Sequence, residues 1–150
     1  MLLCKKLAEN AILPTVTHPG EDLGFDLYAL EGAILSPGVV SKVRTGISAR
    51  MLDENVHWPR IKTKFGLLFK DRSSMAAKGI TCSGGVIDAG YSGELVVMLT
   101  NNSRADYVIN SGDKIIQMIP MPVYTNTEIV EVNELPDSAR TNKGFGSSGR

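Results

Sequence analysis

The stretch DYVINSGDKIIQMIPMPVY (residues 106–124) decides the fold class, because it holds two apolar runs separated by the cluster NSGD. The residues of that cluster accept positive φ angles or hydrogen-bond to their own backbone, so they predict a turn. The flanking runs are rich in Val and Ile, which are typical of strands. The stretch therefore predicts a strand, a turn and a second strand.

The same alternation of short apolar runs and turn-forming clusters continues outward from this stretch. Further runs of the kind are GAILSPGVVSKVRTGISA (32–49), GELVVMLTNNS (93–103) and TEIVEV (127–132). One segment, SSMAAKG (73–79), instead predicts a short helix. Ser73 or Ser74 is suited to cap its start and Gly79 to end it. Many closely spaced strands with one helix predict an all-β sandwich or barrel.

The length of 150 residues predicts one domain with a single core. From PDSAR (136–140) onward, Pro and small polar residues predict a mobile arm. We therefore expect a β domain over residues 1–139 and a flexible C-terminal arm over residues 140–150.

Composition argues against several classes of partner and location. With 16 basic and 16 acidic residues, the chain lacks the surplus of cations that binds the backbone of duplex nucleic acid. No apolar run approaches the roughly 20 residues of a membrane span. The apolar run in the first residues, MLLCKKLAEN, is too short for a signal peptide. Cys4 and Cys82 have no metal-ligand or disulfide-framework spacing. We therefore expect free thiols in a cytoplasmic or otherwise intracellular protein that binds neither nucleic acid nor membrane.

The segment GGVIDAGYSGE (84–94) is the densest candidate for a functional site. Its four glycines allow a backbone to fold tightly around a ligand and to present bare N–H and C=O groups to it. Asp88 follows the apolar Ile87, where burial would raise the carboxyl pKa and make Asp88 a usable base. The alternative is an ordinary β-hairpin with an aspartate in its turn.

The segment DRSSMAAKG (71–79) places Arg72 and two hydroxyl groups at the predicted start of the helix. Free N–H groups, the positive end of the helix dipole and a bidentate guanidinium together suit a phosphate. The alternative is an ordinary helix cap beside a surface arginine.

Two polar residues lie within apolar strands. Asp26 lies in GFDLYA (24–29), where a carboxylate needs either a hydrated metal ion or a salt bridge to Lys or Arg. Gln117 lies in GDKIIQMI (112–119), so its amide needs a specific partner, and a hydrogen bond in the core is the simpler expectation.

Taken in order, these four stretches and the tail RTNKGFGSSG (140–149) resemble the homotrimeric dUTPase family. The resemblance runs from about residue 20 to the end of the chain. It implies a jelly-roll-like β subunit and a trimer with an active site at each subunit boundary. It also implies hydrolysis of dUTP to dUMP and pyrophosphate with Mg²⁺, which keeps uracil out of DNA and supplies dUMP for dTTP synthesis.

The resemblance further implies roles for individual residues. Asp88 is similar to the carboxylate that binds the 3′-hydroxyl and activates the water that attacks the α-phosphorus in line. Tyr91 is similar to the residue whose ring packs under deoxyribose and excludes a ribose 2′-hydroxyl. Asp26 is similar to the carboxylate that holds Mg²⁺ through its water shell. The residues with an implied role in substrate binding are Arg72, Ser73, Ser74, Gly85, Val86, Ile87, Tyr91, Val96, Gln117, Arg140, Phe145, Gly146 and Ser147.

Within that set, the resemblance divides the substrate among three groups of residues. The backbone from Gly85 to Asp88, with Val96, corresponds to a closed hairpin that pairs with the edge of uracil. The helix start and Gln117 correspond to a phosphate site. The arm of another subunit closes the site, with Phe145 stacked on uracil.

Some features leave alternatives open. The segment NVHWPRIKTKFGLLFK (55–70) is longer than the usual connection, and either a longer hairpin with a basic edge or a surface for a protein regulator would account for it. A related enzyme class, the dCTP deaminases, needs a glutamate that reaches the base, and Glu94 is the only acid after Asp88 in its segment. A third alternative is a dUTPase-like module that senses nucleotides without hydrolysing them.

Overall fold

The computed structural model describes residues 1–52, 63–124, 128–134 and 136. In this part of the chain short strands follow one another with turns between them, as the sequence predicts, and one helix interrupts them. In chain order the elements are β1 (Leu2–Lys6), β2 (Phe25–Tyr28), β3 (Ala33–Leu35), β4 (Val40–Val43), β5 (Ile47–Met51), β6 (Thr63–Lys70), α1 (Ser73–Ala76), β7 (Ile80–Cys82), β8 (Val86–Ile87), β9 (Val97–Asn101), β10 (Tyr107–Ile109) and β11 (Lys114–Tyr124).

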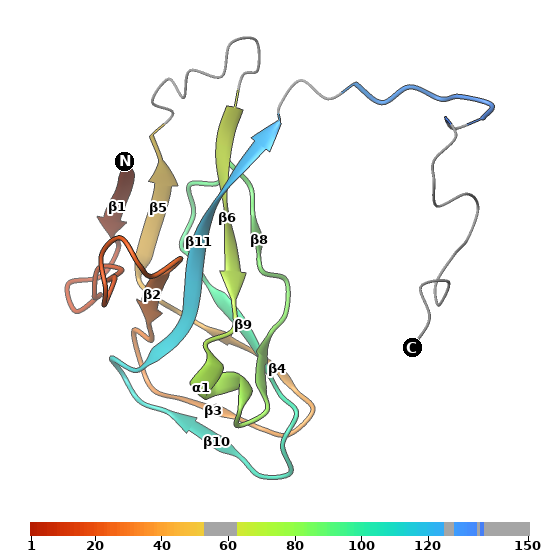
Figure 1. Cartoon of the computed structure of the whole chain (residues 1–150). Coiled ribbons are helices and arrows are strands. Elements are labelled where there is room, and N and C mark those ends of the chain that lie inside the picture. The colour runs from red at the N-terminus through yellow and green to blue at the C-terminus, as the bar shows by residue number, and fades with distance from the viewer. Residues whose placement is uncertain (53–62, 125–127, 135, 137–150) are drawn as a thin grey trace.

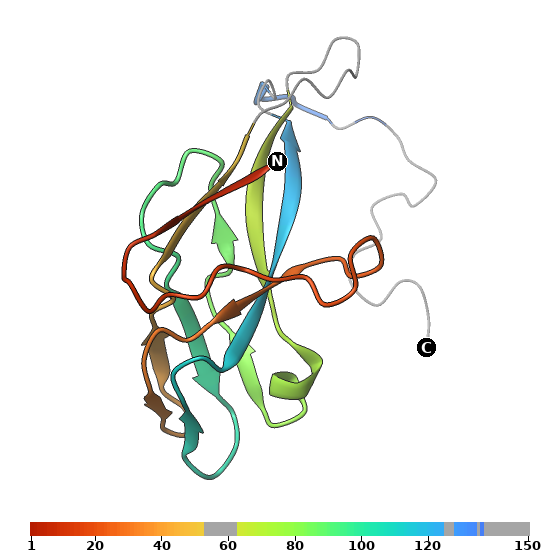
Figure 2. The same ribbon diagram turned by 90° about the vertical axis from the view of Figure 1, so that its left-hand side faces the viewer.

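The strands form antiparallel sheets that pack around one core. One sheet has the order β2-β11-β6-β8, a second has the order β4-β9-β7, and β1-β5 and β10-β3 form two-stranded ribbons. Figure 1 shows β11 lying beside β6, with which it pairs from Gln117 to Tyr124. In both views α1 lies at the lower end of these two strands, near the β10–β3 ribbon (Figure 2). The all-β, jelly-roll-like class is confirmed.

Alternation along the strands builds the core. In β9 the side chains of Val97, Leu99 and Asn101 are buried and the two between them are half-buried, which is the period-two pattern of a strand with one face on a core. The largest fully buried apolar side chains come from nearly every sheet: Leu27, Leu35, Val43, Ile47, Ile80, Leu95, Val97, Leu99, Ile109, Ile115, Ile116 and Met118.

The long strand β11 contains two prolines, which are unusual inside a sheet. Its pairing with β2 stops where Met118 opposes Phe25, while its pairing with β6 continues to Tyr124. Pro120 and Pro122 therefore lie where β11 has lost one neighbour. Since proline has no N–H, this edge position tolerates it and discourages a further strand from adding there.

Three local predictions have definite outcomes. The helix forms where expected and Gly79 follows it with a φ of 80°. The predicted serine cap is wrong, because Arg72 is the N-cap residue, without a side-chain cap bond, and both serines already lie in the first turn. The strand predicted from TEIVEV is also wrong over residues 128–132, which have no strand pairing, and Ile129 is 96% exposed.

Other sequence-based expectations fall partly outside the described residues. The C-terminal arm lies outside them, as does the first half of the long 55–70 segment, whose second half belongs to β6. Cys4 and Cys82 carry free thiols. Among the described residues, no helix is long and apolar enough to cross a membrane.

Candidate active site

A row of polar side chains crosses the outer face of the four-stranded sheet. Gln117 of β11 is in register with Asp26 of β2 on one side and with Lys70 of β6 on the other. Residues directly opposite in antiparallel strands point to the same face of a sheet, so these three side chains form one row. Because β6 ends at Lys70 and α1 starts at Ser73, the row lies next to the start of the helix.

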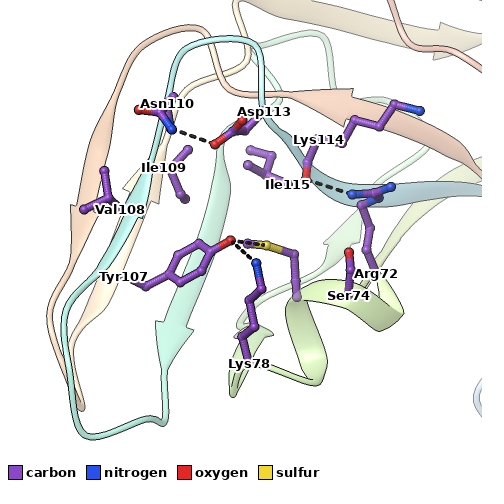
Figure 3. A pocket seen from close by; sticks show the side chains of 11 residues that line it. Arg72, Ser74, Lys78, Tyr107, Val108, Ile109, Asn110, Asp113, Lys114 and Ile115 are labelled. Carbon is purple, nitrogen blue, oxygen red and sulfur yellow. Dashed lines mark hydrogen bonds between the residues drawn. The ribbon is translucent and has the colours of Figure 1, made fainter.

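Asp26 anchors this row and binds two cations. Its buried carboxylate accepts a hydrogen bond from Arg72 Nε at 2.9 Å and one from Lys114 Nζ at 2.8 Å. Arg72 also donates to the carbonyl oxygen of Lys114 at 3.1 Å, as Figure 3 shows. Of the two alternatives for Asp26, the salt bridge to basic residues is present. Two cations on one carboxylate leave a net positive charge, which suits an anionic ligand.

We call Asp26, Arg72 and Lys114 the Arg72 cluster. Its contacts also affect the pKa of Lys114. The hydrogen bond to Asp26, with the charge of that carboxylate, raises the pKa of Lys114 above its ordinary value. Lys114 therefore carries its positive charge throughout the neutral range. Lys114 lies inside the GDKIIQMI stretch, but no local pattern in the sequence connects position 114 with position 26, so its role could not be predicted.

Gln117 does not behave as predicted. It is half-buried, and within the described residues its amide has no side-chain hydrogen bond, so the expected bond in the core is wrong. The amide points from the same face as Asp26. It therefore remains available to a ligand bound over the row.

The start of α1 adds hydrogen-bond donors beside this cluster. Ser73 and Ser74 are exposed, and the first N–H groups of a helix have no acceptor within the helix. A cavity of about 450 Å³ opens between α1 and the segment from β10 to β11, with Arg72, Ser74 and Lys78 among its lining residues (Figure 3). The predicted phosphate site is thus accessible and basic.

The segment 84–94 does not form the closed hairpin that was expected. Its first arm, β8, pairs with β6, with Ile87 opposite Leu67, and its second arm leads through residues 94–96 into β9 of another sheet. Within the described residues, no backbone hydrogen bond joins residues 85–88 to 94–96. The two arms separate because they belong to different sheets, and the backbone of each arm bonds to other segments, as the Gly85 carbonyl does to the Phe69 N–H and the Leu95 N–H to the Ile47 carbonyl.

Gly85 is needed where the first arm meets β6. The Phe69 N–H donates to the Gly85 carbonyl at 2.7 Å. A Cβ atom on Gly85 would lie 2.7 Å from the Phe69 carbonyl oxygen, which is too close for any side chain. The glycine is therefore required by the approach of two backbones.

Asp88 and Tyr91 lie at the surface of the single chain. Asp88 is exposed, so the expected burial of its carboxylate is wrong for the single chain. The Tyr91 N–H donates to the Asp88 carbonyl at 2.9 Å, which closes a turn. The Tyr91 ring folds back over Gly93, and its hydroxyl donates to the Glu94 carbonyl at 2.9 Å.

The structure does not bring Asp88 to the Arg72 cluster within one chain. The register of β8 places Asp88 beside Gly66, four residues along β6 from Lys70, which is a separation of roughly 13 Å at the rise of a strand. The cavity of Figure 3 is lined by no residue of segment 84–94. Arg140, Phe145, Gly146 and Ser147 lie outside the described residues.

The carboxylate of the Arg72 cluster fits a Mg²⁺ ion that is bound through water, and not one bound directly by protein side chains. Among the described residues, no group of three or more His, Cys, Asp or Glu side chains could hold a metal ion directly. Asp26 is a lone carboxylate whose oxygens already bind Arg72 and Lys114. It therefore fits a Mg²⁺ ion that keeps its waters and takes its direct ligands from phosphates, not one bound in a protein cage.

Comparison with known proteins shows similarity to one protein family over nearly the whole chain. The sequence model of the dUTPase family matches residues 9–149. The deoxyuridine 5′-triphosphate nucleotidohydrolase of Clostridioides difficile is 36% identical over 99% of this chain and 97% of its own length. That of Solibacter usitatus is 41% identical over 94% of this chain and 90% of its own length.

Solved structures agree with the fold. The dUTPase of Staphylococcus bacteriophage 80alpha with dUPNHPP covers all of this chain and 99% of its own, with a TM-score of 0.85 and 26% identity. A mutant dUTPase of phage phi11 of S. aureus, described with a structural Mg(II) ion, covers 91% of this chain and 99% of its own. Its TM-score is 0.76 and it is 24% identical, so this likeness supports the fold alone.

Proposed function

The chain belongs to the dUTPase family, and we propose that it hydrolyses dUTP to dUMP and pyrophosphate with the residues described above. The observation that carries the proposal is the match to dUTP nucleotidohydrolases over nearly the whole chain. Such an enzyme clears dUTP, which keeps uracil out of DNA, and supplies dUMP for dTTP synthesis. Because its substrate belongs to the nucleotide pool, we infer a cytoplasmic or otherwise intracellular location.

The phosphates of dUTP would lie over the basic cluster at the start of α1. Arg72 supplies a fixed guanidinium, and the N–H and hydroxyl groups of Ser73 and Ser74 supply neutral donors. Gln117 offers an amide that no side chain of the described residues uses. When bound, Mg²⁺ would neutralise phosphate charge, with Asp26 accepting hydrogen bonds from its waters.

The base would be recognised by the open arms of segment 84–94. Residues 85–88 and Val96 present backbone donors and acceptors in fixed positions, and the two arms do not pair with each other. Uracil matches such groups, whereas cytosine would leave some of them unpaired, and an unpaired buried group discriminates strongly. The gap between the arms, not a closed hairpin, would hold the base.

Asp88 is the proposed base for the chemical step. Its carboxylate would bind the 3′-hydroxyl and accept a proton from a water molecule. The water oxygen then forms a bond to the α-phosphorus while the bond from the α-phosphorus to the bridging oxygen breaks. Pyrophosphate leaves with that electron pair, and positioning together with charge stabilisation lowers the barrier.

We propose a homotrimer with shared active sites, because the proposed base and the proposed phosphate site lie apart among the described residues of one chain. Asp88 and the Arg72 cluster are separated in the single chain, so a complete site needs groups from neighbouring subunits. The arm of residues 140–150 would close the site, with Phe145 over uracil and Arg140, Gly146 and Ser147 at the outer phosphates. A protein regulator at residues 55–70 remains a proposal from sequence, and residues 55–62 lie outside the described residues.

The geometry of Glu94 argues against the deaminase alternative. Its carboxylate accepts hydrogen bonds from Arg44 Nε at 3.1 Å and from the Gly46 N–H at 2.8 Å. These contacts turn the carboxylate toward the turn between β4 and β5. A glutamate held there is not free to act on a base, and no other acid follows Asp88 in this segment.

The test is pyrophosphate release from dUTP, dTTP, dCTP and UTP measured side by side, with and without a chelator of Mg²⁺. We expect release from dUTP alone and a large loss on chelation. Ammonia from dCTP would favour the deaminase alternative. Tight binding of dUTP without pyrophosphate release would favour the nucleotide-sensing module.

A further inference from the structure

A set of hydrogen bonds fastens the Tyr91 end of segment 84–94 to the turn between β4 and β5. We call residues 91–95 the tyrosine segment and residues 44–48 the support turn. The Glu94 carboxylate accepts hydrogen bonds from Arg44 Nε at 3.1 Å and from the Gly46 N–H at 2.8 Å. The Leu95 carbonyl accepts one from Thr45 Oγ1 at 2.7 Å, and the Leu95 N–H donates to the Ile47 carbonyl at 2.7 Å. Ser48 Oγ donates to the Ser92 carbonyl at 2.9 Å. The tyrosine segment is therefore held in place although it has no strand partner there.

Glu94 links this support to the Tyr91 side chain. Its carboxylate binds the support turn, while its carbonyl oxygen accepts the hydrogen bond from the Tyr91 hydroxyl at 2.9 Å. Glu94 is largely buried, with 18% of its side chain exposed, whereas Arg44 is 49% exposed. The contact to the Gly46 N–H is thus the better protected of the two carboxylate contacts.

Gly93 makes the Tyr91 position possible. A Cβ atom there would lie 2.5 Å from the Tyr91 hydroxyl oxygen, so the ring occupies the space that a side chain at position 93 would need. Tyr91 is 43% exposed, and the bond of its backbone N–H to the Asp88 carbonyl does not restrain the ring. The hydroxyl contact to Glu94 is therefore what fixes the tip of the ring.

We propose that Glu94 is a positioning residue for sugar selectivity, which acts by holding the Tyr91 ring through the support turn. The inference rests on the proposed function, in which Tyr91 packs under deoxyribose and excludes the ribose 2′-hydroxyl. A displaced ring would open space for that hydroxyl. The chemistry at Asp88 would be affected less, because Asp88 lies before Tyr91 in the turn and makes no contact with the Glu94 carboxylate.

The experiment measures kcat and KM for dUTP and UTP in the full-length enzyme and four variants. Glu94→Ala removes both carboxylate contacts. Glu94→Gln keeps an oxygen that can accept from the Gly46 N–H, and serves as the conservative rescue. Tyr91→Ala reports the role of the ring itself. Glu31→Ala, at an exposed carboxylate outside this network, is the matched control.

We expect Glu94→Ala to lower the dUTP-over-UTP ratio of kcat/KM by about tenfold, because both contacts of the carboxylate with the support turn are lost, and mainly through a lower KM for UTP. Glu94→Gln is expected to keep most of the wild-type ratio, and Glu31→Ala all of it. Circular dichroism and thermal melts identify a temperature at which every variant is folded.

The outcomes separate the inference from the proposed function. If Tyr91→Ala admits UTP and Glu94→Ala lowers only the melting temperature, Glu94 is merely structural and the inference is overturned. If Tyr91→Ala leaves sugar selectivity unchanged, the proposed role of Tyr91 is wrong, and the inference is overturned with it. The proposed hydrolysis of dUTP is tested separately, by pyrophosphate release from the wild-type enzyme.

Discussion

Replacing Gly85 by alanine tests the close approach of β8 to β6, on which the proposed recognition of uracil depends. The added Cβ would lie 2.7 Å from the Phe69 carbonyl oxygen and 3.3 Å from the Phe69 Cβ. The nearer atom belongs to the backbone of a central strand, so it cannot move aside as the end of a flexible side chain would. The first arm of segment 84–94 must instead shift away from β6.

The expected cost follows from two contributions. Forcing an extra methyl group into a packed site costs about 1–3 kcal/mol. Moving the arm also weakens the 2.7 Å hydrogen bond from the Phe69 N–H to the Gly85 carbonyl, which costs about 1 kcal/mol. The free energy of unfolding should therefore fall by about 2–4 kcal/mol, which at an m value of about 2 kcal/mol/M lowers the urea midpoint by about 1–2 M.

The assay is urea unfolding followed by circular dichroism at one fixed protein concentration, since assembly would make stability depend on concentration. Gly90→Ala is the matched control in the same segment, because a Cβ there meets no atom within 4 Å. The control should change the free energy of unfolding by less than about 0.5 kcal/mol. If Gly85→Ala is equally mild, the two backbones do not approach as described, and the reasoning is refuted.

Three further predictions concern the site. Asp88→Asn should keep dUTP binding, measured by calorimetry, and lower turnover by a factor of about 100 or more, since it removes the base; wild-type turnover would exclude Asp88 from the chemistry. Deleting residues 141–150 should sharply lower turnover without changing the mass of the assembly in light scattering, whereas normal activity would contradict the proposed closure of the site by the C-terminal arm. Asp26→Asn should lower the free energy of unfolding in urea by about 1–3 kcal/mol, because Arg72 and Lys114 lose their charged partner; an unchanged value would mean that the ion pairs contribute nothing to stability.

The local chemistry of the sequence predicts most of the fold. Turn clusters and β-branched runs place strands at 107–109 and 114–124, and the one helical stretch forms α1. The exceptions have clear reasons. Residues 128–132 have the composition of a strand, but a strand needs a partner, and none of the described residues pairs with them. The serine cap failed because helix ends are uncertain by a residue or two from sequence alone.

The site shows a similar division between local and distant information. The sequence identifies Asp26, Arg72 and the glycine-rich segment as chemically unusual, because a carboxylate in an apolar strand and a cluster of glycines are local facts. It does not predict that Asp26 pairs with both Arg72 and Lys114, or that Glu94 binds the support turn, because these partners lie between 46 and 88 residues apart in the chain.

The sequence by itself therefore determined the class of fold, the family and the residue types of the site. Only the tertiary structure decided that the arms of segment 84–94 separate into two sheets, that Asp88 is exposed in the single chain, and that the Glu94 carboxylate binds the support turn. The physical reason is that turn formation and alternation depend on neighbours in sequence. Strand pairing and ion pairing depend instead on which distant segments the packing of the core brings together.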